Sequence, residues 1–197
     1  MGKMRIIGLT GGCGTGKSTV AGILAEKGGY IIDADKLTVT LQKPGAAAYE
    51  EIVKWLGEEY LLPDGNLNRR KIAELVFQDK QALRKLNAIV HTKVAEEIKS
   101  SVAAIESAHD DGFVVLDVPI PVERGFLDTA DVIWVVSAND DLRVERLMER
   151  MNISENEAVL RINNQMSNRE YEELADVVIE NEKGIDELRW KVEEALE

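Results

Sequence analysis

Eight consecutive residues near the N-terminus have the types and spacing of a loop that binds phosphate groups. Residues 11–18 read Gly-Gly-Cys-Gly-Thr-Gly-Lys-Ser and follow a short apolar run at residues 5–10. Glycines allow successive backbone amides to turn toward an anion, and a helix that begins directly after the loop adds its positive end. This phosphate loop therefore predicts binding of a nucleoside triphosphate, with Mg²⁺ as its companion.

Two side chains of the phosphate loop have specific expected roles. Lys17 is expected to reach the β- and γ-phosphates, and the Ser18 hydroxyl to bind Mg²⁺. A glycine-rich turn without a ligand is the alternative, but the position between a buried strand and an amphipathic helix favours the binding loop. The expected nucleotide-binding residues here are Gly12, Cys13, Gly14, Thr15, Gly16, Lys17, Ser18 and Thr19.

Three carboxylates follow two further apolar runs and are candidates for metal binding and proton transfer. Asp117 ends one run, and Asp33 and Asp35 follow another. In a parallel sheet, such positions lie at the carboxyl edge beside the phosphate loop. Asp117 is expected to bind Mg²⁺, directly or through one of its ligands, or else to be an exposed carboxylate at a strand end. Val118 after it, where NTP-hydrolysing motors commonly carry glutamate, favours an acceptor other than water. Asp33 or Asp35 is expected to orient an acceptor hydroxyl and take its proton, or else to cap the following helix.

Apolar runs that alternate with amphipathic stretches predict the elements that position these residues. The expected strands cover residues 5–10, 30–32, 113–117, 132–136 and 177–179. Because these runs are apolar throughout, they predict a five-stranded parallel sheet covered by helices on both faces, an α/β fold of the P-loop NTPase type. Capping-box patterns that begin at Ser154 and Ser167 predict the starts of two helices.

One domain with three regions is expected from this pattern. The core covers residues 1–43, 112–138 and 175–197, a helical acceptor-binding insert covers 44–111, and a helical lid covers 139–174. In the lid, Arg146 and Arg150 lie one helical turn apart and suit phosphate oxygens, or else form a solvated face with neighbouring glutamates. In the insert, Arg69 and Arg70 belong to the densest basic cluster, which could hold an anionic acceptor or simply start a helix.

Composition limits the class of partner. The chain has 197 residues and a net charge of −12, which argues against a general nucleic-acid binder, since such a protein needs a basic surface. No run approaches the roughly 18 apolar residues of a membrane span. With one cysteine, Cys13, and no signal-peptide pattern, a cytoplasmic protein without membrane partners is expected. The three tryptophans, Trp55, Trp134 and Trp190, are expected in the core.

Segments along nearly the whole chain resemble the dephospho-CoA kinase family. The most specific are Asp-Ala-Asp-Lys at residues 33–36 and Asp-Gly-Asn-Leu-Asn-Arg-Arg at residues 64–70. The others are the phosphate loop, Val-Phe at 76–77, Ile-Val-His at 89–91, Leu-Asp-Val-Pro at 116–119, Arg-Leu-Met-Glu-Arg at 146–150 and the segment 175–181. The resemblance implies a nucleoside-monophosphate-kinase-like core, a CoA-binding insert and a lid. It also implies transfer from ATP to the ribose 3′-hydroxyl of dephospho-CoA.

The resemblance also implies roles for individual residues. Asp35 matches the base and, with Lys17 and Arg146, makes up the expected catalytic set. Arg146, Arg150 and Asn181 are expected to contact ATP, and Ser18 and Asp117 to bind Mg²⁺. The expected acceptor-binding residues are Asp33, Asp35, Arg69, Arg70, Phe77, His91, Pro119 and Glu123.

The chain departs from the family's usual pattern at three places. Pro121 stands for a leucine, Thr92 for a proline, and Met151-Asn152 for Asp-Gly. These differences leave two alternatives, a P-loop kinase of another small acceptor such as a nucleoside monophosphate, and an ATP-sensing module without catalysis. The expected partners are ATP and dephospho-CoA, and the expected state is a monomer or a small homo-oligomer.

Overall fold

The structure is a computed structural model that describes residues 3–118 and 129–197. The chain divides into two compact units, one made of Met1–Asp33 with Ala103–Glu197 and the other of Ala34–Val102. Within the described ranges, no helix is both long enough and apolar enough to cross a membrane.

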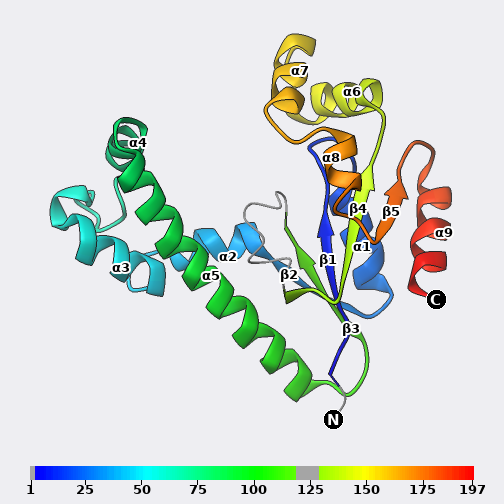
Figure 1. Cartoon of the computed structure of the whole chain (residues 1–197), viewed down its shortest axis with the longest axis horizontal. Helices are drawn as coiled ribbons and strands as arrows, with labels where there is room; N and C mark the ends of the chain where they lie inside the picture. The colour runs from blue at the N-terminus through cyan, green and yellow to red at the C-terminus, as the bar shows by residue number, and fades with distance from the viewer. Residues whose placement is uncertain (1–2, 119–128) are drawn as a thin grey trace. The chain divides into compact units, whose positions relative to one another are not determined.

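A parallel sheet forms the centre of the first unit (Figure 1). Its strands are β1 (Ile6–Thr10), β2 (Gly29–Asp33), β3 (Phe113–Asp117), β4 (Val132–Ser137) and β5 (Val177–Glu180). Their order is β2-β3-β1-β4-β5 and every pairing is parallel, which confirms the predicted five-stranded parallel sheet. Because the strands are parallel, the loop that follows β1 lies at the same edge of the sheet as the ends of β3 and β4. Because β1 lies between these two strands, their ends are its direct neighbours.

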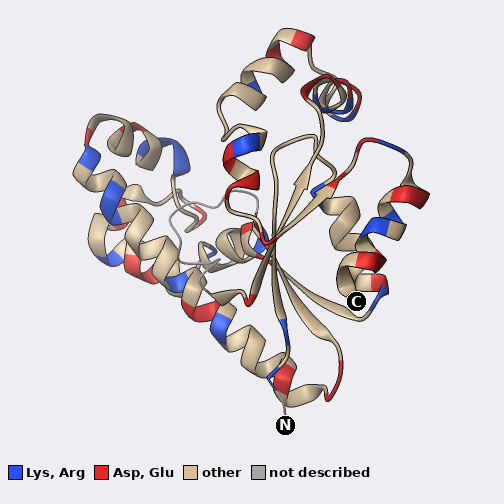
Figure 2. Cartoon of the chain, turned by 45° about the vertical axis from the view of Figure 1, so that its right-hand side comes forward, with Lys and Arg blue, Asp and Glu red and all other residues tan. Residues whose placement is uncertain are grey.

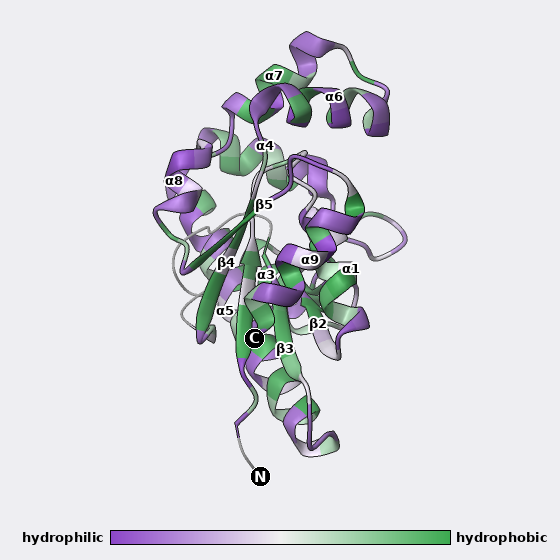
Figure 3. Ribbon diagram, turned by 90° about the vertical axis from the view of Figure 1, so that its right-hand side faces the viewer, coloured by the Kyte–Doolittle hydropathy of each residue, from purple (hydrophilic) through white to green (hydrophobic). Residues whose placement is uncertain are grey.

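Helices α1 (Lys17–Glu26) and α9 (Ile185–Leu196) cover one face of this sheet, and α8 (Asn168–Glu172) lies on the opposite face (Figure 3). The strands are largely hydrophobic in Figure 3 and almost free of charged residues in Figure 2, as expected where both faces of a parallel sheet are covered. The buried cluster under α1 and α9 includes Ile7, Leu9, Val20, Leu24, Val115, Trp134, Leu188 and Val192.

Trp134 is fully buried, as predicted, but Trp190 is 57% exposed, so its assignment to the core was wrong. Leu188 and Val192 are the residues of α9 that face the core. Trp190 lies two positions from each, which turns it to the opposite side of the helix.

Helices α6 (Asp140–Met151), α7 (Glu155–Asn163) and α8 follow β4. Both predicted capping boxes are present at the starts of α7 and α8. Ser154 pairs with Glu157, and Ser167 pairs with Glu170. In each pair the serine side chain accepts from the backbone amide of the glutamate, and the glutamate side chain accepts from the backbone amide of the serine. These local contacts fix where the two helices begin.

The second unit is helical, like the predicted insert. Its elements are α2 (Ala34–Leu41), α3 (Ala47–Leu56), the 3₁₀ helix η1 (Glu58–Tyr60), α4 (Arg69–Gln78) and most of α5 (Lys80–Ala108). Its core contains Tyr49, Ile52, Leu67 and Ile72. Helix α5 continues without a break through Thr92. The unit begins at Ala34 and includes α2, which packs against α3.

Candidate functional site

The phosphate loop leaves β1 and leads directly into α1. Gly14 and Gly16 have φ angles of 81° and 92°, in the left-handed region that residues with a side chain rarely adopt. Thr15 is buried, and its hydroxyl donates to the Gly12 carbonyl over 2.8 Å, which closes the turn. Among the described residues, no side chain caps α1. Its positive end therefore stays available for an anion.

Lys17 and Asp117 form an ion pair at the carboxyl edge of the sheet. Their side chains are only 17% and 14% exposed. Asp117 is the last residue of β3 and pairs in register with Leu9 of β1. The structure therefore brings together the cation expected to bind phosphate and the carboxylate expected to bind the metal.

Asp33 lies beside Asp117 in the sheet, and Asp35 follows it by two residues in the chain. Asp33 ends β2 and is the register partner of Asp117 on β3, so two carboxylates end adjacent strands. Asp35 lies in the first turn of α2. Two residues of chain span at most about 7 Å, which keeps Asp35 close to Asp33.

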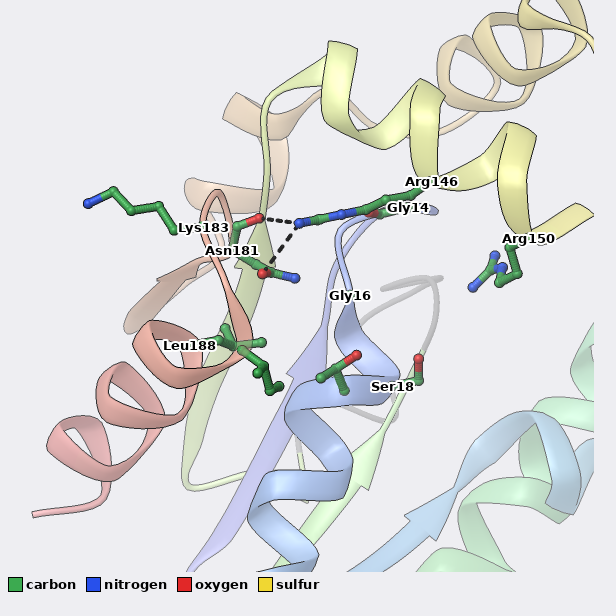
Figure 4. A pocket seen from close by; sticks show the side chains of 10 residues that line it. Gly14, Gly16, Ser18, Arg146, Arg150, Asn181, Lys183 and Leu188 are labelled. Atoms are coloured by element: carbon green, nitrogen blue, oxygen red, sulfur yellow. Dashed lines mark hydrogen bonds between the residues drawn. The ribbon is translucent and has the colours of Figure 1, made fainter.

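Arg146 and Asn181 support the outer side of the phosphate loop. Arg146 donates to the carbonyls of Gly14 and Thr15, over 3.3 and 3.4 Å. It also donates to the Asn181 carbonyl over 2.9 Å, as Figure 4 shows. Asn181 is 7% exposed, and its Nδ2 donates to the Thr15 carbonyl over 2.8 Å. Carbonyls on the outside of such a loop need donors, and these two side chains supply them.

A cavity of 330 Å³ opens beside the loop in the first unit (Figure 4). Its lining residues are Gly14, Gly16, Ser18, Thr19, Arg146, Arg150, Asn181, Lys183, Ile185 and Leu188. All of these except Lys183, Ile185 and Leu188 were predicted from the sequence as nucleotide-binding residues. These three residues were not predicted. They follow β5 at the carboxyl edge of the sheet, and this position was the one signal in the sequence that could have placed them at the nucleotide site. Cationic groups beside an apolar wall suit the phosphates and the base of a nucleotide.

Ser18 and Asp117 provide a hydroxyl and a carboxylate, the hard oxygen donors that Mg²⁺ prefers. Within the described part of the chain, no group of three or more His, Cys, Asp or Glu side chains could hold a metal ion. Mg²⁺ commonly takes one or two protein ligands and completes its coordination with substrate phosphates and water. The available donors therefore fit a metal that arrives with the nucleotide.

The acceptor residues predicted in the second unit occupy separate places. Arg69 begins α4 and lines a cavity of 210 Å³ together with Gln42. The remaining lining residues are aliphatic: Ile52, Leu67, Ile72, Ala73, Val76 and Leu86. Phe77 is 91% exposed at the end of α4, and His91 lies on α5.

Three other acceptor-side predictions have different outcomes. The Arg70 side chain is 89% exposed and pairs with Glu74 of the same helix, which is the ordinary helix-surface arrangement. Pro119 and Glu123 lie outside the described residues, as does the departure at Pro121.

Comparisons with known proteins point to one family. The family model described as dephospho-CoA kinase matches residues 5–187. A dephospho-CoA kinase of Carboxydothermus hydrogenoformans is 40% identical over 187 residues, which cover 95% of this chain and 90% of the relative. A crystal structure from Thermus thermophilus has a TM-score of 0.80 and 32% identity, covering 99% of this chain and 97% of that one. Dephospho-CoA kinase from Campylobacter jejuni shares the fold, with a TM-score of 0.69, 23% identity, and coverage of 97% and 94%.

Proposed function

The chain belongs to the dephospho-CoA kinase family, and we propose that it transfers the γ-phosphoryl group of ATP to the ribose 3′-hydroxyl of dephospho-CoA. It is a kinase of coenzyme A biosynthesis, and ATP is its phosphoryl donor. The main observation in support of this site is that two carboxylates, Asp33 and Asp117, end adjacent strands beside the phosphate loop. A donor phosphate and an acceptor hydroxyl can both be held at such an edge.

The first unit binds the donor in this proposal. Lys17 contacts the β- and γ-phosphates, and to do so it leaves Asp117, its partner in this structure. Ser18 and Asp117 would hold Mg²⁺, which when bound neutralises charge on the phosphate oxygens. Arg146 and Arg150, both at the cavity, add guanidinium groups in a protein whose net charge is −12. Arg146 has a double role, because it also supports the loop.

The second unit binds the acceptor in this proposal, and the residues that line its cavity are chemically complementary to the acceptor. Dephospho-CoA has an anionic diphosphate and a long arm with geminal methyl groups and two amides. Arg69 suits the diphosphate, Gln42 suits an amide, and the aliphatic wall suits the methyl groups. A nucleoside monophosphate lacks this arm, so the cavity favours dephospho-CoA over that alternative. The other proposed acceptor contacts are Asp33, Arg70, Phe77, His91, Pro119 and Glu123.

Asp35 is the general base in this proposal. Its carboxylate orients the 3′-hydroxyl and accepts the proton as the oxygen attacks the γ-phosphorus and ADP leaves. The Asp35→Asn variant is expected to retain ATP binding and to lose about two to four orders of magnitude in transfer rate. The measurements are ADP release with dephospho-CoA and calorimetric titration with ATP. The matched control is Asp111→Asn, the same change at an exposed position.

Three outcomes separate the alternatives. Unchanged turnover of Asp35→Asn removes this residue from the role of base. A preference for AMP over dephospho-CoA indicates a nucleoside monophosphate kinase. ATP binding without acceptor-dependent ADP release indicates a sensing module.

The setting of the enzyme is also part of the proposal. We place it in the cytoplasm as a monomer or small homo-oligomer, without nucleic-acid or membrane partners. The net charge of −12 disfavours binding to nucleic acid. A single cysteine fits a reducing compartment, where disulfides are rare.

A further inference from the structure

Arg143 is the one charged residue of the described chain that is almost fully buried, with 1% of its surface exposed. A buried guanidinium is costly unless hydrogen bonds compensate the lost hydration. Its carboxylate partner, Asp140, lies 2.9 Å away but is 67% exposed, so a buried ion pair is not the main compensation. The position of Arg143 therefore has to be explained by its other contacts.

The guanidinium of Arg143 joins the phosphate loop to the segment that follows β4. Its Nε donates to the Cys13 carbonyl over 2.9 Å. Its Nη1 donates to Asp140 on α6 and, over 3.0 Å, to the Asn168 side chain at the start of α8. Asn168 in turn donates to the Ala138 carbonyl at the end of β4. These contacts outside the loop fix the orientation of the Arg143 side chain.

The same residue of the loop is held from a second direction. The Cys13 amide donates to Oε1 of Gln165, beyond the end of α7, over 2.7 Å. Both backbone polar groups of Cys13 are therefore bonded to side chains of the region 139–174, and the Cys13 side chain packs against the cluster of Leu147 and Ala158. The peptide group before Cys13 is thus held by Gln165 and the peptide group after it by Arg143, which keeps the loop amides in their orientation.

Gly12 shows how closely the guanidinium fits the loop. Its φ lies outside the left-handed region, so backbone conformation alone does not require glycine there. A Cβ at this position would lie 2.5 Å from Nη2 and 3.1 Å from Cζ of Arg143. Arg143 cannot move away without breaking its bonds to Cys13 and Asn168. The contact with Arg143 is therefore what excludes a side chain at residue 12.

We propose that Arg143 is a positioning residue for phosphoryl transfer, which acts through the Cys13 carbonyl and sets the shape of the phosphate loop. It does not contact the nucleotide. The proposal rests on the donor site assigned above, because the loop amides must point at the phosphates of ATP. A misplacement of about 1 Å can cost two orders of magnitude in rate.

A double-mutant cycle between Gly12→Ala and Arg143→Ala tests this inference. Each single variant is expected to lower kcat/KM for ATP by about tenfold to a hundredfold, with KM for dephospho-CoA unchanged. The double variant is expected to be no worse than Arg143→Ala, because the added methyl group then has room. Arg143→Lys is expected to restore activity only partly, since an ammonium lacks the planar fork of donors. The matched control, Arg169→Ala on α8, removes a side chain that is 87% exposed and should leave the kinetics unchanged.

Multiplicative losses in the double variant would overturn the proposal, because the two residues would then act separately. Equal increases in both KM values with a lower melting temperature would also overturn it, as a sign of general unfolding. Should Arg143→Ala fail to fold, Gln165→Ala removes the bond to the Cys13 amide alone. It is expected to weaken ATP binding at an unchanged melting temperature, and unchanged ATP affinity contradicts the proposal. Calorimetry with ATP alone keeps this test separate from the identity of the acceptor.

Discussion

Asp117 has two competing partners, the Lys17 ammonium in this structure and, in the proposed mechanism, the Mg²⁺ that accompanies ATP. The Asp117→Asn variant is therefore expected to change ATP affinity in opposite directions with and without the metal. Without Mg²⁺, affinity should rise by at least about fivefold, since even water-screened charges interact by roughly 1 kcal/mol at contact distance. With Mg²⁺, transfer should fall by at least about tenfold.

Nucleotide titrations in EDTA and in excess Mg²⁺ measure both effects. The matched control is Glu180→Gln, which neutralises a carboxylate at the end of β5 that is 67% exposed. Weaker binding of Asp117→Asn in EDTA would contradict competition for Lys17.

Residue chemistry alone predicted Lys17, Ser18 and Asp117, because motif spacing and strand ends are local signals. Arg143 was different. In the sequence it is one of several arginines that alternate with glutamates on one helix. Its burial depends on contact with Cys13, which is 130 positions away in the chain, and no local pattern encodes that contact.

At the scale of elements, the end of α6 departs from ordinary geometry at Asn152. It is the one non-glycine residue of the described chain with a positive φ, 51°. Asparagine tolerates this conformation better than other side chains. Asn152→Ala is expected to destabilise the fold by about 1 kcal/mol, or about 2–4 °C in melting temperature. Asn152→Gly should be neutral or slightly stabilising, and equal melting temperatures of the two variants would contradict this account.

Elements with local signals were predicted from the sequence. The strands and the capping boxes at Ser154 and Ser167 are examples, because hydrophobic runs and caps depend on neighbours within a few residues. The place of α2 in the second unit depends on its packing against α3 and not on its own short sequence, so no local signal encodes it.

At the scale of the whole molecule, the two units are expected to carry different substrates. Ala73 lines the cavity of the second unit, which has a volume of 210 Å³. The larger side chain of an Ala73→Leu variant would fill part of this cavity. KM for dephospho-CoA is expected to rise by about tenfold or more, the cost of misfitting a small apolar group, while KM for ATP stays unchanged. Steady-state kinetics measure both values, with Ala104→Leu on the exposed side of α5 as the control. A rise in KM for ATP as well, or no change in either value, would contradict this division.

The distribution of tryptophans leaves the helical unit with one tryptophan of its own. Trp134 lies fully buried in the sheet, Trp190 is largely exposed on α9, and Trp55 lies in the helical unit with the Lys85 ammonium 5.0 Å from its ring centre. These three are all the tryptophans of the chain. With Trp134 and Trp190 replaced by phenylalanine, emission from Trp55 reports on the acceptor-binding unit alone. The protein therefore contains a natural fluorophore for following acceptor binding without an added dye.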